Sequence, residues 1–352
     1  MLRDIADPES KSSVDAAMSA LRILLRKEGS AADQQWRRWA YAIVDIDVLS
    51  SYFASRLWQE ILEFDSTLSG HVSEPIPLDA PAVVVAGSGK ESFKTFNVST
   101  AASILAAASG AVVVKGVSRS VSAVSGSADV LKFLGLQVVN SPVEIPEVLE
   151  SNGIVFVSYS AFCPTYAGRY DGVFRSLSPF SFFMPVAVLG VQAFSFIYGI
   201  AHQNVSLAAD AIRAVRPDLK RGVVVATELS PHEVMDEWGS YGTTYSASLD
   251  EGRVRLSRGT HRPVPAGWRS AVAHRSHHRA NAELLTSSLA PDGCPSCADL
   301  VERNAALIVA ASLWGQMNEE TALSHVRRVR MAGKAARLLV ELRDSEGRSD
   351  AS

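Results

Sequence analysis

The chain has 352 residues, of which 47% are hydrophobic, and a formal net charge of -3 at pH 7. This length and apolar content allow a large core, as one big domain or two closely joined ones. The nearly neutral balance and the lack of a Lys/Arg stripe argue against nucleic acid as the main partner, because neutralising many phosphates needs clustered positive charge. Three cysteines are too few for a disulfide framework. No apolar signal segment is visible over residues 1–13, so we expect a cytoplasmic protein.

The first part of the chain, from Val14 to about Leu68, has a helical pattern in which apolar residues recur at spacings of three and four. Gly29 and Ser30 predict a helix stop followed by a new N-cap. The stretch 65–81 carries three prolines in its second half, which is typical of a linker. We therefore predict a small helical domain over residues 1–72 and a larger domain over residues 73–352.

From residue 83 onward, short apolar runs alternate with amphipathic helical stretches. Strands are expected at residues 83–85, 112–114, 136–139, 154–157, 194–198 and 223–226. This alternation is typical of an α/β fold with a mostly parallel sheet flanked by helices. A hairpin over residues 244–256 and helices over 299–342 complete the prediction.

One segment, 176–209, contains no Asp, Glu, Lys or Arg and is long enough to span a bilayer. Its prolines, glycines and polar residues favour a buried passage through a large core, because a lipid-facing helix must keep its backbone hydrogen bonds.

Turns of small residues follow the first two predicted strands. The first strand leads into Gly-Ser-Gly at 87–89, and a helix is expected to begin at Asn97; the second ends at Lys115 and leads into a Ser-rich turn, 118–127. A strand, a turn of small residues and a helix N-terminus together present several backbone N–H groups to one anion. Two such turns in succession predict a polyphosphate held from both sides.

Three ordered motifs resemble those of the anthranilate phosphoribosyltransferases. Residues 86–100 resemble the family's pyrophosphate loop, Gly-Thr-Gly-Gly-Asp, four residues, then Phe-Asn-hydrophobic-Ser-Thr. Residues 115–129 are similar to its Lys-His-Gly-Asn-Arg-Ser-Val-Ser and Ser-Gly-Ser segments. Residues 235–237 and 242–244 are similar to its Leu-Asp-Glu and Gly-Pro-Thr-Thr. Weaker similarity covers nearly the whole chain, and three ordered motifs are far more specific than a lone Gly-x-Gly.

The resemblance implies phosphoribosyl pyrophosphate (PRPP) as donor, bound with Mg²⁺, on a small helical domain plus a larger α/β domain, joined in space by a segment near 160–190. It also implies a homodimer through the N-terminal helices. The implied donor-binding residues are Gly87, Ser88, Gly89, Lys90, Glu91, Thr95, Asn97, Ser99, Thr100, Lys115 and Ser127. The implied catalytic residues are Lys115, Asp236 and Glu237, and the implied metal ligands are Ser99, Asp236 and Glu237. Carboxylate oxygens suit Mg²⁺, and fixed charges can stabilise the departing pyrophosphate.

Several positions depart from the family's pattern. Lys90 and Glu91 stand where the motif has its second consecutive Gly and its Asp, and residues 116–118 replace His-Gly-Asn. In the segment similar to Pro-Val-Arg-Arg-Glu-Leu, Phe174 stands opposite the Arg that the family uses for the anthranilate carboxylate, and Arg175 opposite its neighbour. Losing a buried Arg partner typically costs a carboxylate about 2–5 kcal/mol. Anthranilate is therefore expected to be a poor acceptor.

We accordingly expect an Mg²⁺-dependent enzyme that moves 5-phosphoribose from PRPP to a neutral or cationic acceptor, in specialised metabolism, with release of pyrophosphate. The expected acceptor-binding residues are Gly116, Ser118, Tyr166, Tyr170, Phe174 and Arg175, with Tyr159 and Phe162 adding to an aromatic wall. Core packing explains most of these aromatic side chains equally well. Three alternatives stay open: an anthranilate phosphoribosyltransferase of tryptophan biosynthesis, a nucleoside phosphorylase-like enzyme, and a non-catalytic relative.

One further group lies outside the resemblance. His274, His277 and His278 precede Cys294 and Cys297 by a short helical stretch. Two His and two Cys could complete a tetrahedral Zn²⁺ site, although the order is reversed relative to common zinc fingers. A polar surface beside a loop is the alternative explanation.

Overall fold

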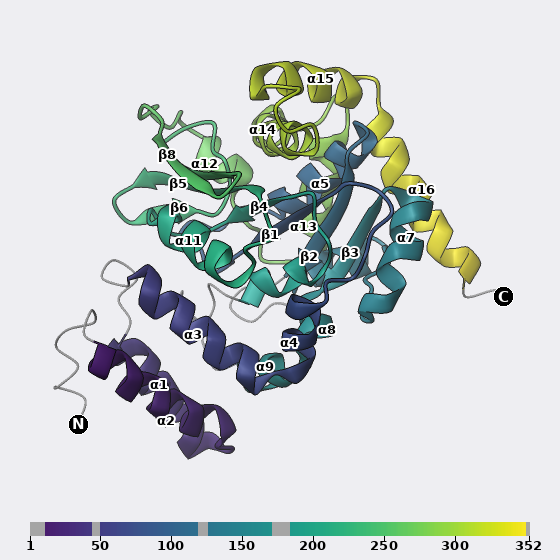
Figure 1. Ribbon diagram of the computed structural model, residues 1–352. Coiled ribbons are helices and arrows are strands. Elements are labelled where there is room, and N and C mark those ends of the chain that lie inside the picture. Colours follow the sequence, from purple (N-terminus) through teal and green to yellow (C-terminus); the bar gives the residue numbers. More distant parts are fainter. Residues whose placement is uncertain (1–10, 44–49, 119–125, 171–183, 350–352) are drawn as a thin grey trace.

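The fold is α/β, with one sheet between two layers of helices (Figure 1). The computed structural model describes residues 11–43, 50–118, 126–170 and 184–349. The strands are β1 (Ala82–Gly87), β2 (Val112–Val117), β3 (Ile154–Ser158), β4 (Ser195–Gly199), β5 (Arg221–Ser230), β6 (Glu233–Met235), β7 (Thr243–Asp250) and β8 (Arg253–Arg258). Their order is β3-β2-β1-β4-β5-β7-β8, with β6 paired to β5. Strands β1 to β5 run parallel, and β6, β7 and β8 are antiparallel additions.

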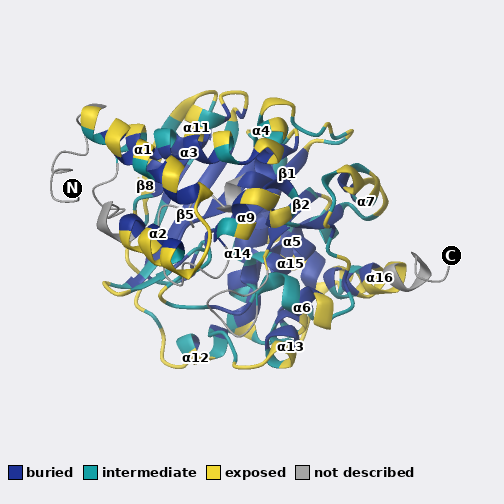
Figure 2. Cartoon of the chain, turned by 90° about the horizontal axis from the view of Figure 1, so that it is seen from below, coloured by how far each residue is buried: buried dark blue, intermediate teal, exposed yellow. Residues whose placement is uncertain are grey.

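The parallel strands are apolar on both faces, which explains why they read as continuous hydrophobic runs rather than as alternating ones. In β1, Val83 and Val85 belong to one core, whereas Val84 and Ala86 belong to the other. Figure 2 shows these strands as the buried centre of the molecule, with the exposed surface on the outer sides of the helices.

One helical layer contains the N-terminal helices. Its members are α1 (Lys11–Arg26), α2 (Ser30–Ile43), α3 (Ser51–Phe64), α4 (Ser66–Ser73), α7 (Ile145–Asn152), α8 (Tyr159–Phe162), α9 (Pro164–Tyr170) and α11 (Val205–Val215), with the 3₁₀ segments η1 (Pro142–Glu144) and η2 (Met184–Gly190). Their buried side chains form a continuous core with one face of the sheet.

Helix α9 is tied to the N-terminal helices by polar contacts. The backbone N–H of Tyr166 donates to Asp65 Oδ2 at 2.8 Å, and Arg169 donates to the Asp33 carboxylate and to the carbonyl oxygen of Leu24. The division of the chain into domains at residues 72 and 73 stays a prediction, since the N-terminal helices share their core with the sheet.

The other layer covers the opposite face. It contains α5 (Val98–Ala108), α6 (Ser127–Phe133), α12 (Trp268–Val272), α13 (His278–Leu289), α14 (Pro295–Ser312), α15 (Glu319–Met331) and α16 (Lys334–Ser349). Figure 1 shows α14 and α15 above the sheet and α16 along its side, far from the N-terminal helices. The side chains of this layer form the second core.

The strand predicted at residues 136–139 is wrong. Only Val139 makes an isolated bridge, to Val157. Gly135 has a φ of 70°, and Pro142 starts a 3₁₀ turn, so the chain turns on both sides of this run and only Val139 pairs with β3.

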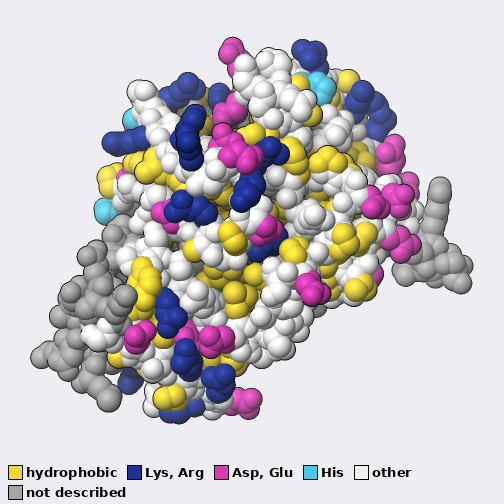
Figure 3. Space-filling model, in the orientation of Figure 1, with side chains coloured by type: hydrophobic (Ala, Val, Ile, Leu, Met, Phe, Trp, Pro, Cys, Tyr) yellow, Lys and Arg dark blue, Asp and Glu magenta, His cyan; other side chains and the backbone are white. Residues whose placement is uncertain are grey.

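Across the described residues, we find no helix with the length and apolar character needed to cross a membrane. On the face shown in Figure 3, basic and acidic side chains are interspersed rather than gathered by sign.

Candidate active site

Gly87, a predicted site residue, and Gly199, which the sequence did not point to, lie at the carboxyl edge of the sheet, where parallel strands end together. Gly87 of β1 pairs with Gly199 of β4. A Cβ at Gly87 would lie 2.7 Å from Asp236 Oδ2, and a Cβ at Gly199 would lie 1.8 Å from the Asp236 carbonyl oxygen. The loop that follows β1 is also joined to this carboxylate, because the backbone N–H of Gly89 donates to Asp236 Oδ2 at 3.0 Å. Glycine is therefore required at both strand ends by the approach of Asp236.

Glu237 is buried beside Asp236 and is only half satisfied. Its Oε1 accepts a hydrogen bond from Thr95 Oγ1 at 2.6 Å, whereas its Oε2 has no hydrogen-bond partner among the described residues. Burial, followed by the charges of Asp236 and Glu91, raises the pKa of Glu237 well above its ordinary value. Thr227 holds this turn, since its Oγ1 donates to the Glu237 carbonyl oxygen at 2.7 Å.

Glu91 adds a third carboxylate to this group. Burial and the neighbouring Asp236 raise the pKa of Glu91 to about 8, and its Oε2 also lacks a hydrogen-bond partner among the residues that the structure describes. Burial likewise raises the pKa of Asp236. The three buried carboxylates are therefore costly to ionise together.

Lys115 lies near these acids on β2 and is only 2% exposed. Its Nζ donates to the carbonyl oxygen of Gly116 at 2.7 Å. Burial lowers the pKa of Lys115 to about 8, although Asp236 and Glu237 favour its charged form. A buried ammonium group of this kind can serve an anion that enters the same edge.

The N-terminus of α5 has unused polar groups. Asn97 is its N-cap residue but makes no side-chain cap hydrogen bond. The Oδ1 atom of Asn97 and the Oγ1 atom of Thr100 are buried without hydrogen-bond partners within the described ranges. Ser99 lies between Asn97 and Thr100 in the first turn of this 11-residue helix. The Thr100 hydroxyl and the backbone N–H groups at this helix N-terminus can donate to an anion, whereas Asn97 Oδ1 can only accept a hydrogen bond.

The first loop itself is partly used within the protein. The Ser88 N–H donates to the Gly199 carbonyl oxygen at 2.8 Å, and Ser88 Oγ accepts a hydrogen bond from the N–H of Ala201 at 2.9 Å. Ser88 therefore braces the loop, and its predicted contact with a donor gains no support from this geometry. In the second turn, the N–H of Ser118 donates to Ser127 Oγ at 3.3 Å; residues 119–125 lie outside the described part of the chain.

Comparison with known proteins assigns this arrangement to a family. Residues 79–336 match the model described as "Glycosyl transferase family, a/b domain". The chain therefore belongs to this glycosyl transferase family. Its α/β region carries all of the strands and both turns described above.

Relatives of this glycosyl transferase include anthranilate phosphoribosyltransferases. It is 33% identical to that of Leifsonia xyli over 154 residues, or 42% of this chain and 44% of the relative. It is 35% identical to that of Bacillus licheniformis over 205 residues, or 53% and 58%. The chain thus spans about half the length of the curated relatives it matches.

Solved structures of the same kind share the fold. The Thermus thermophilus anthranilate phosphoribosyltransferase superposes with a TM-score of 0.71 at 20% identity, covering 94% of each chain. The Saccharomyces cerevisiae enzyme, in complex with PRPP and Mg, gives 0.73 at 16% identity, covering 98% of this chain and 96% of that one.

The residues expected on the acceptor side of the glycosyl transferase are only partly brought together. Tyr166 and Tyr170 are buried, at 1% and 4% exposure, with ring centroids 5.6 Å apart. Tyr166 therefore packs in the core in this structure. Phe174 and Arg175 lie outside the described residues.

Lys90 makes a contact with Tyr170 that the sequence did not predict. Its φ is 62°, in the left-handed region, and its Nζ donates to the Tyr170 hydroxyl at 2.7 Å while lying 4.8 Å from the ring centroid. The side chain that stands where the family motif has bare backbone thus joins the first loop to α9.

Two important positions were missed from the sequence. Gly199 and Thr227 shape the Asp236 turn, yet neither belongs to a motif. The one signal in the sequence was Gly199 at the end of an apolar run. It indicates where a strand ends, but not that the Asp236 backbone packs against that strand end.

The zinc hypothesis is wrong. Among the described residues, no group of three or more His, Cys, Asp or Glu side chains is placed to hold a metal ion. Cys294 Sγ instead accepts a hydrogen bond from the Cys297 N–H as the N-cap of α14, and Cys297 is buried with its Sγ donating to the Ala271 carbonyl oxygen. His274 Nε2 lies 3.3 Å from Asn281 Nδ2.

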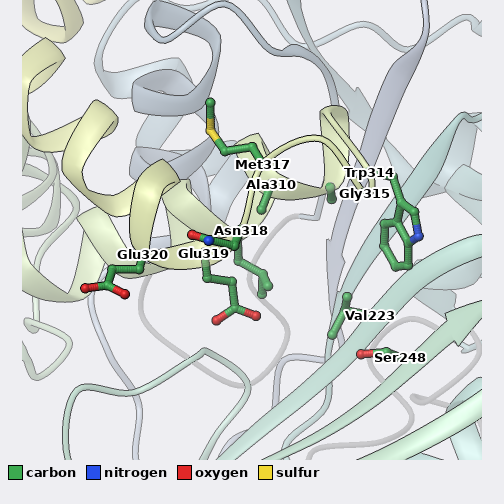
Figure 4. Close-up of a pocket in the computed structure, with 11 residues that line it drawn as sticks. Val223, Ser248, Ala310, Trp314, Gly315, Met317, Asn318, Glu319 and Glu320 are labelled. Carbon is green, nitrogen blue, oxygen red and sulfur yellow. The ribbon is translucent and has the colours of Figure 1, made fainter.

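A separate pocket of about 540 Å³ lies near the start of β5 (Figure 4). Val223, Ser248 and Trp314 line it, with Glu319 and Glu320 at one side. Because Val223 is near the amino end of β5, this pocket lies away from the carboxyl edge that carries the candidate site.

Proposed function

We propose that this glycosyl transferase moves 5-phosphoribose from PRPP to a small-molecule acceptor and releases pyrophosphate. The observation that carries the proposal is the convergence of four features at one sheet edge: the loop after β1, the N-terminus of α5, Lys115, and the Asp236–Glu237 pair. The first three suit a diphosphate, and the acidic pair suits a cation that accompanies it.

The carboxylates fit Mg²⁺. Mg²⁺ is usually bound by one or two carboxylates together with phosphate oxygens, and buried Glu237 Oε2 has no protein partner in the described ranges. Asp236 and Glu237 would hold the ion, with Ser99 as the third predicted ligand. When bound, Mg²⁺ would neutralise charge on the diphosphate. The S. cerevisiae relative is described with PRPP and Mg, which supports this assignment.

The protein's own groups would act on the leaving diphosphate. Lys115 would place a positive charge beside it, and the N-terminus of α5 would supply hydrogen-bond donors from its backbone N–H groups and from the Thr100 hydroxyl. Donors fixed before the reaction are effective because they need no reorganisation as charge develops.

The metal test uses a matched control. Asp236→Asn/Glu237→Gln should reduce Mg²⁺-dependent pyrophosphate release at least 100-fold, because both predicted ligands lose their charge. Asp250→Asn/Glu251→Gln changes another adjacent Asp-Glu pair, in the β7–β8 turn, and should keep the parent rate. Unchanged turnover in the first variant would contradict the metal assignment and favour a phosphorylase-like reaction with single phosphate. Donor-dependent thermal stabilisation without pyrophosphate release from the parent would instead identify a non-catalytic relative.

The acceptor is the finer part of the proposal. The named relatives are anthranilate phosphoribosyltransferases, which favours anthranilate, the alternative kept above. The replacement of His-Gly-Asn by residues 116–118, and of the family's Arg by Phe174, favours an acceptor that needs no carboxylate partner. We propose a neutral or cationic aromatic amine.

Three acceptors of one shape decide between these choices. Anthranilate, 2-aminobenzamide and 2-aminobenzylamine present the same aromatic amine with an anionic, neutral or cationic neighbour. We expect kcat/KM to be at least tenfold higher for one of the last two. A clear preference for anthranilate would overturn the acceptor proposal and leave the donor proposal intact.

The homodimer, the cytoplasmic location and a role in specialised metabolism stay predictions. Exposed apolar side chains on the N-terminal helices, such as Ile23 at 57% and Tyr52 at 45%, support a self-association surface there. Sedimentation of the purified chain would test the dimer.

A further inference from the structure

The aromatic ring of Tyr159 covers strand β2 at Gly116, the residue after Lys115. Gly116 is the next residue on β2, paired with Val157 of β3. A Cβ at Gly116 would lie 2.4 Å from Tyr159 Cε1 and 2.7 Å from Val188 Cγ2. Atoms at these distances overlap, so the ring of Tyr159 occupies the space that a side chain at position 116 would need.

Tyr159 also contacts the other strand of the site. Its hydroxyl donates to the carbonyl oxygen of Gly87, the last residue of β1, at 3.3 Å. The ring therefore reaches from β2 to the end of β1, and it is only 7% exposed. Burial raises the pKa of the Tyr159 phenol, and the charge on Asp236 adds to the shift.

We infer that Gly116 and Tyr159 form a size-complementary pair that sets acceptor specificity. This inference rests on the proposed function. The pair lies next to the proposed donor loop because the Tyr159 hydroxyl contacts Gly87 at the end of β1. An acceptor beside this wall meets a neutral phenol ring in place of a side chain from position 116. A neutral, apolar wall disfavours a carboxylate and accommodates an uncharged aromatic group.

The pair is tested by enlarging the residue at position 116 and truncating the side chain at position 159. Gly116→His, Tyr159→Ala and the double variant are compared with the parent and with Gly70→His, a matched change on α4 where a Cβ would meet nothing within 4 Å. The readout is the ratio of the dissociation constants for 2-aminobenzamide and anthranilate. Both constants are measured from the fluorescence of these two probes. Thermal unfolding of each variant is measured in parallel.

We expect Gly116→His alone to unfold at lower temperature than the parent, and Tyr159→Ala to restore part of the stability in the double variant, because Val188 Cγ2 still lies 2.7 Å from the Cβ position. We expect the binding ratio to shift at least tenfold toward anthranilate in the double variant and to stay within twofold of the parent in Gly70→His. A ratio within twofold of the parent in the double variant would overturn the inference. So would a parent that binds neither probe. Because binding needs no turnover, a failure of the proposed function appears separately, as absent pyrophosphate release with binding preserved.

Discussion

The backbone of Lys90 leads to a specific prediction about stability. Its φ of 62° lies in the left-handed region, where a residue with a Cβ is disfavoured by roughly 1–2 kcal/mol relative to glycine. At an unstrained position, Ala stabilises a protein over Gly by about 0.4–1 kcal/mol, because it restricts the unfolded chain. At position 90 the order should be reversed: Lys90→Ala should be about 1 kcal/mol less stable than Lys90→Gly.

This comparison isolates the backbone because both variants lack the lysine side chain. Relative to the parent, each loses the charge-assisted hydrogen bond to the Tyr170 hydroxyl at 2.7 Å, worth about 1.5–3 kcal/mol. Glycine recovers about 1 kcal/mol of this loss by relieving the strain. We therefore expect both variants to be less stable than the parent, with Lys90→Ala the least stable of the three.

Urea unfolding followed by tryptophan fluorescence measures the difference, with one slope fitted to all variants so that midpoints can be compared. Two glycines serve as controls. Gly153 has a φ of 69° and open space around its Cβ position, so Gly153→Ala should destabilise by about 1 kcal/mol. Gly70 has open space and no positive φ, so Gly70→Ala should not destabilise. If Lys90→Ala is as stable as Lys90→Gly while the controls behave as expected, the left-handed backbone at Lys90 is refuted.

Four further results are expected. PRPP affinity should fall about tenfold per pH unit above pH 8, because Lys115, with a pKa of about 8, loses its proton and its positive charge there. Isothermal titration calorimetry should show a weaker dependence of PRPP affinity on pH for Lys115→Arg. The free energy of unfolding should rise as the pH rises from about 8 to 10.5, the ordinary pKa of lysine, because Lys115 keeps its proton in the unfolded chain over this range and loses it in the folded protein. If a Lys115→Met variant still shows this rise, the assignment to Lys115 is contradicted. Glu302→Ala should destabilise by about 3–5 kcal/mol, because it leaves Arg330, bonded to Glu302 at 2.6 Å and 9% exposed, without its carboxylate; an unchanged urea midpoint would show that the pair is dispensable. Gly199→Ala should lower PRPP affinity more than tenfold, since its Cβ would lie 1.8 Å from the Asp236 carbonyl oxygen; Gly70→Ala is its control in a donor titration.

The local order of the chain was readable from the sequence. Apolar runs that are buried on both faces of a parallel sheet are continuous, so most of the strands were predicted close to their observed bounds, and the alternation with helices predicted the fold class. The strand expected at residues 136–139 failed because an apolar run alone does not show that nearby Gly135 and Pro142 bend the chain away.

Part of the candidate site could also be predicted from local sequence patterns. The loop after β1, Lys115 and the Asp236–Glu237 pair are each local patterns, and parallel strands bring their carboxyl ends to one edge. What depends on pairs of distant residues was not readable. The left-handed Lys90, its bond to Tyr170, and the Thr95–Glu237 hydrogen bond each join segments that no spacing rule connects.

The sequence by itself determined an α/β architecture and the order of the phosphate-binding patterns, because both arise from interactions between near neighbours along the chain. Tertiary structure alone decided that Gly199 must lack a side chain, that Tyr159 covers Gly116, and that Cys294 caps a helix instead of binding zinc. These outcomes depend on which atoms compete for the same space, and that competition exists only after the strands and helices have packed.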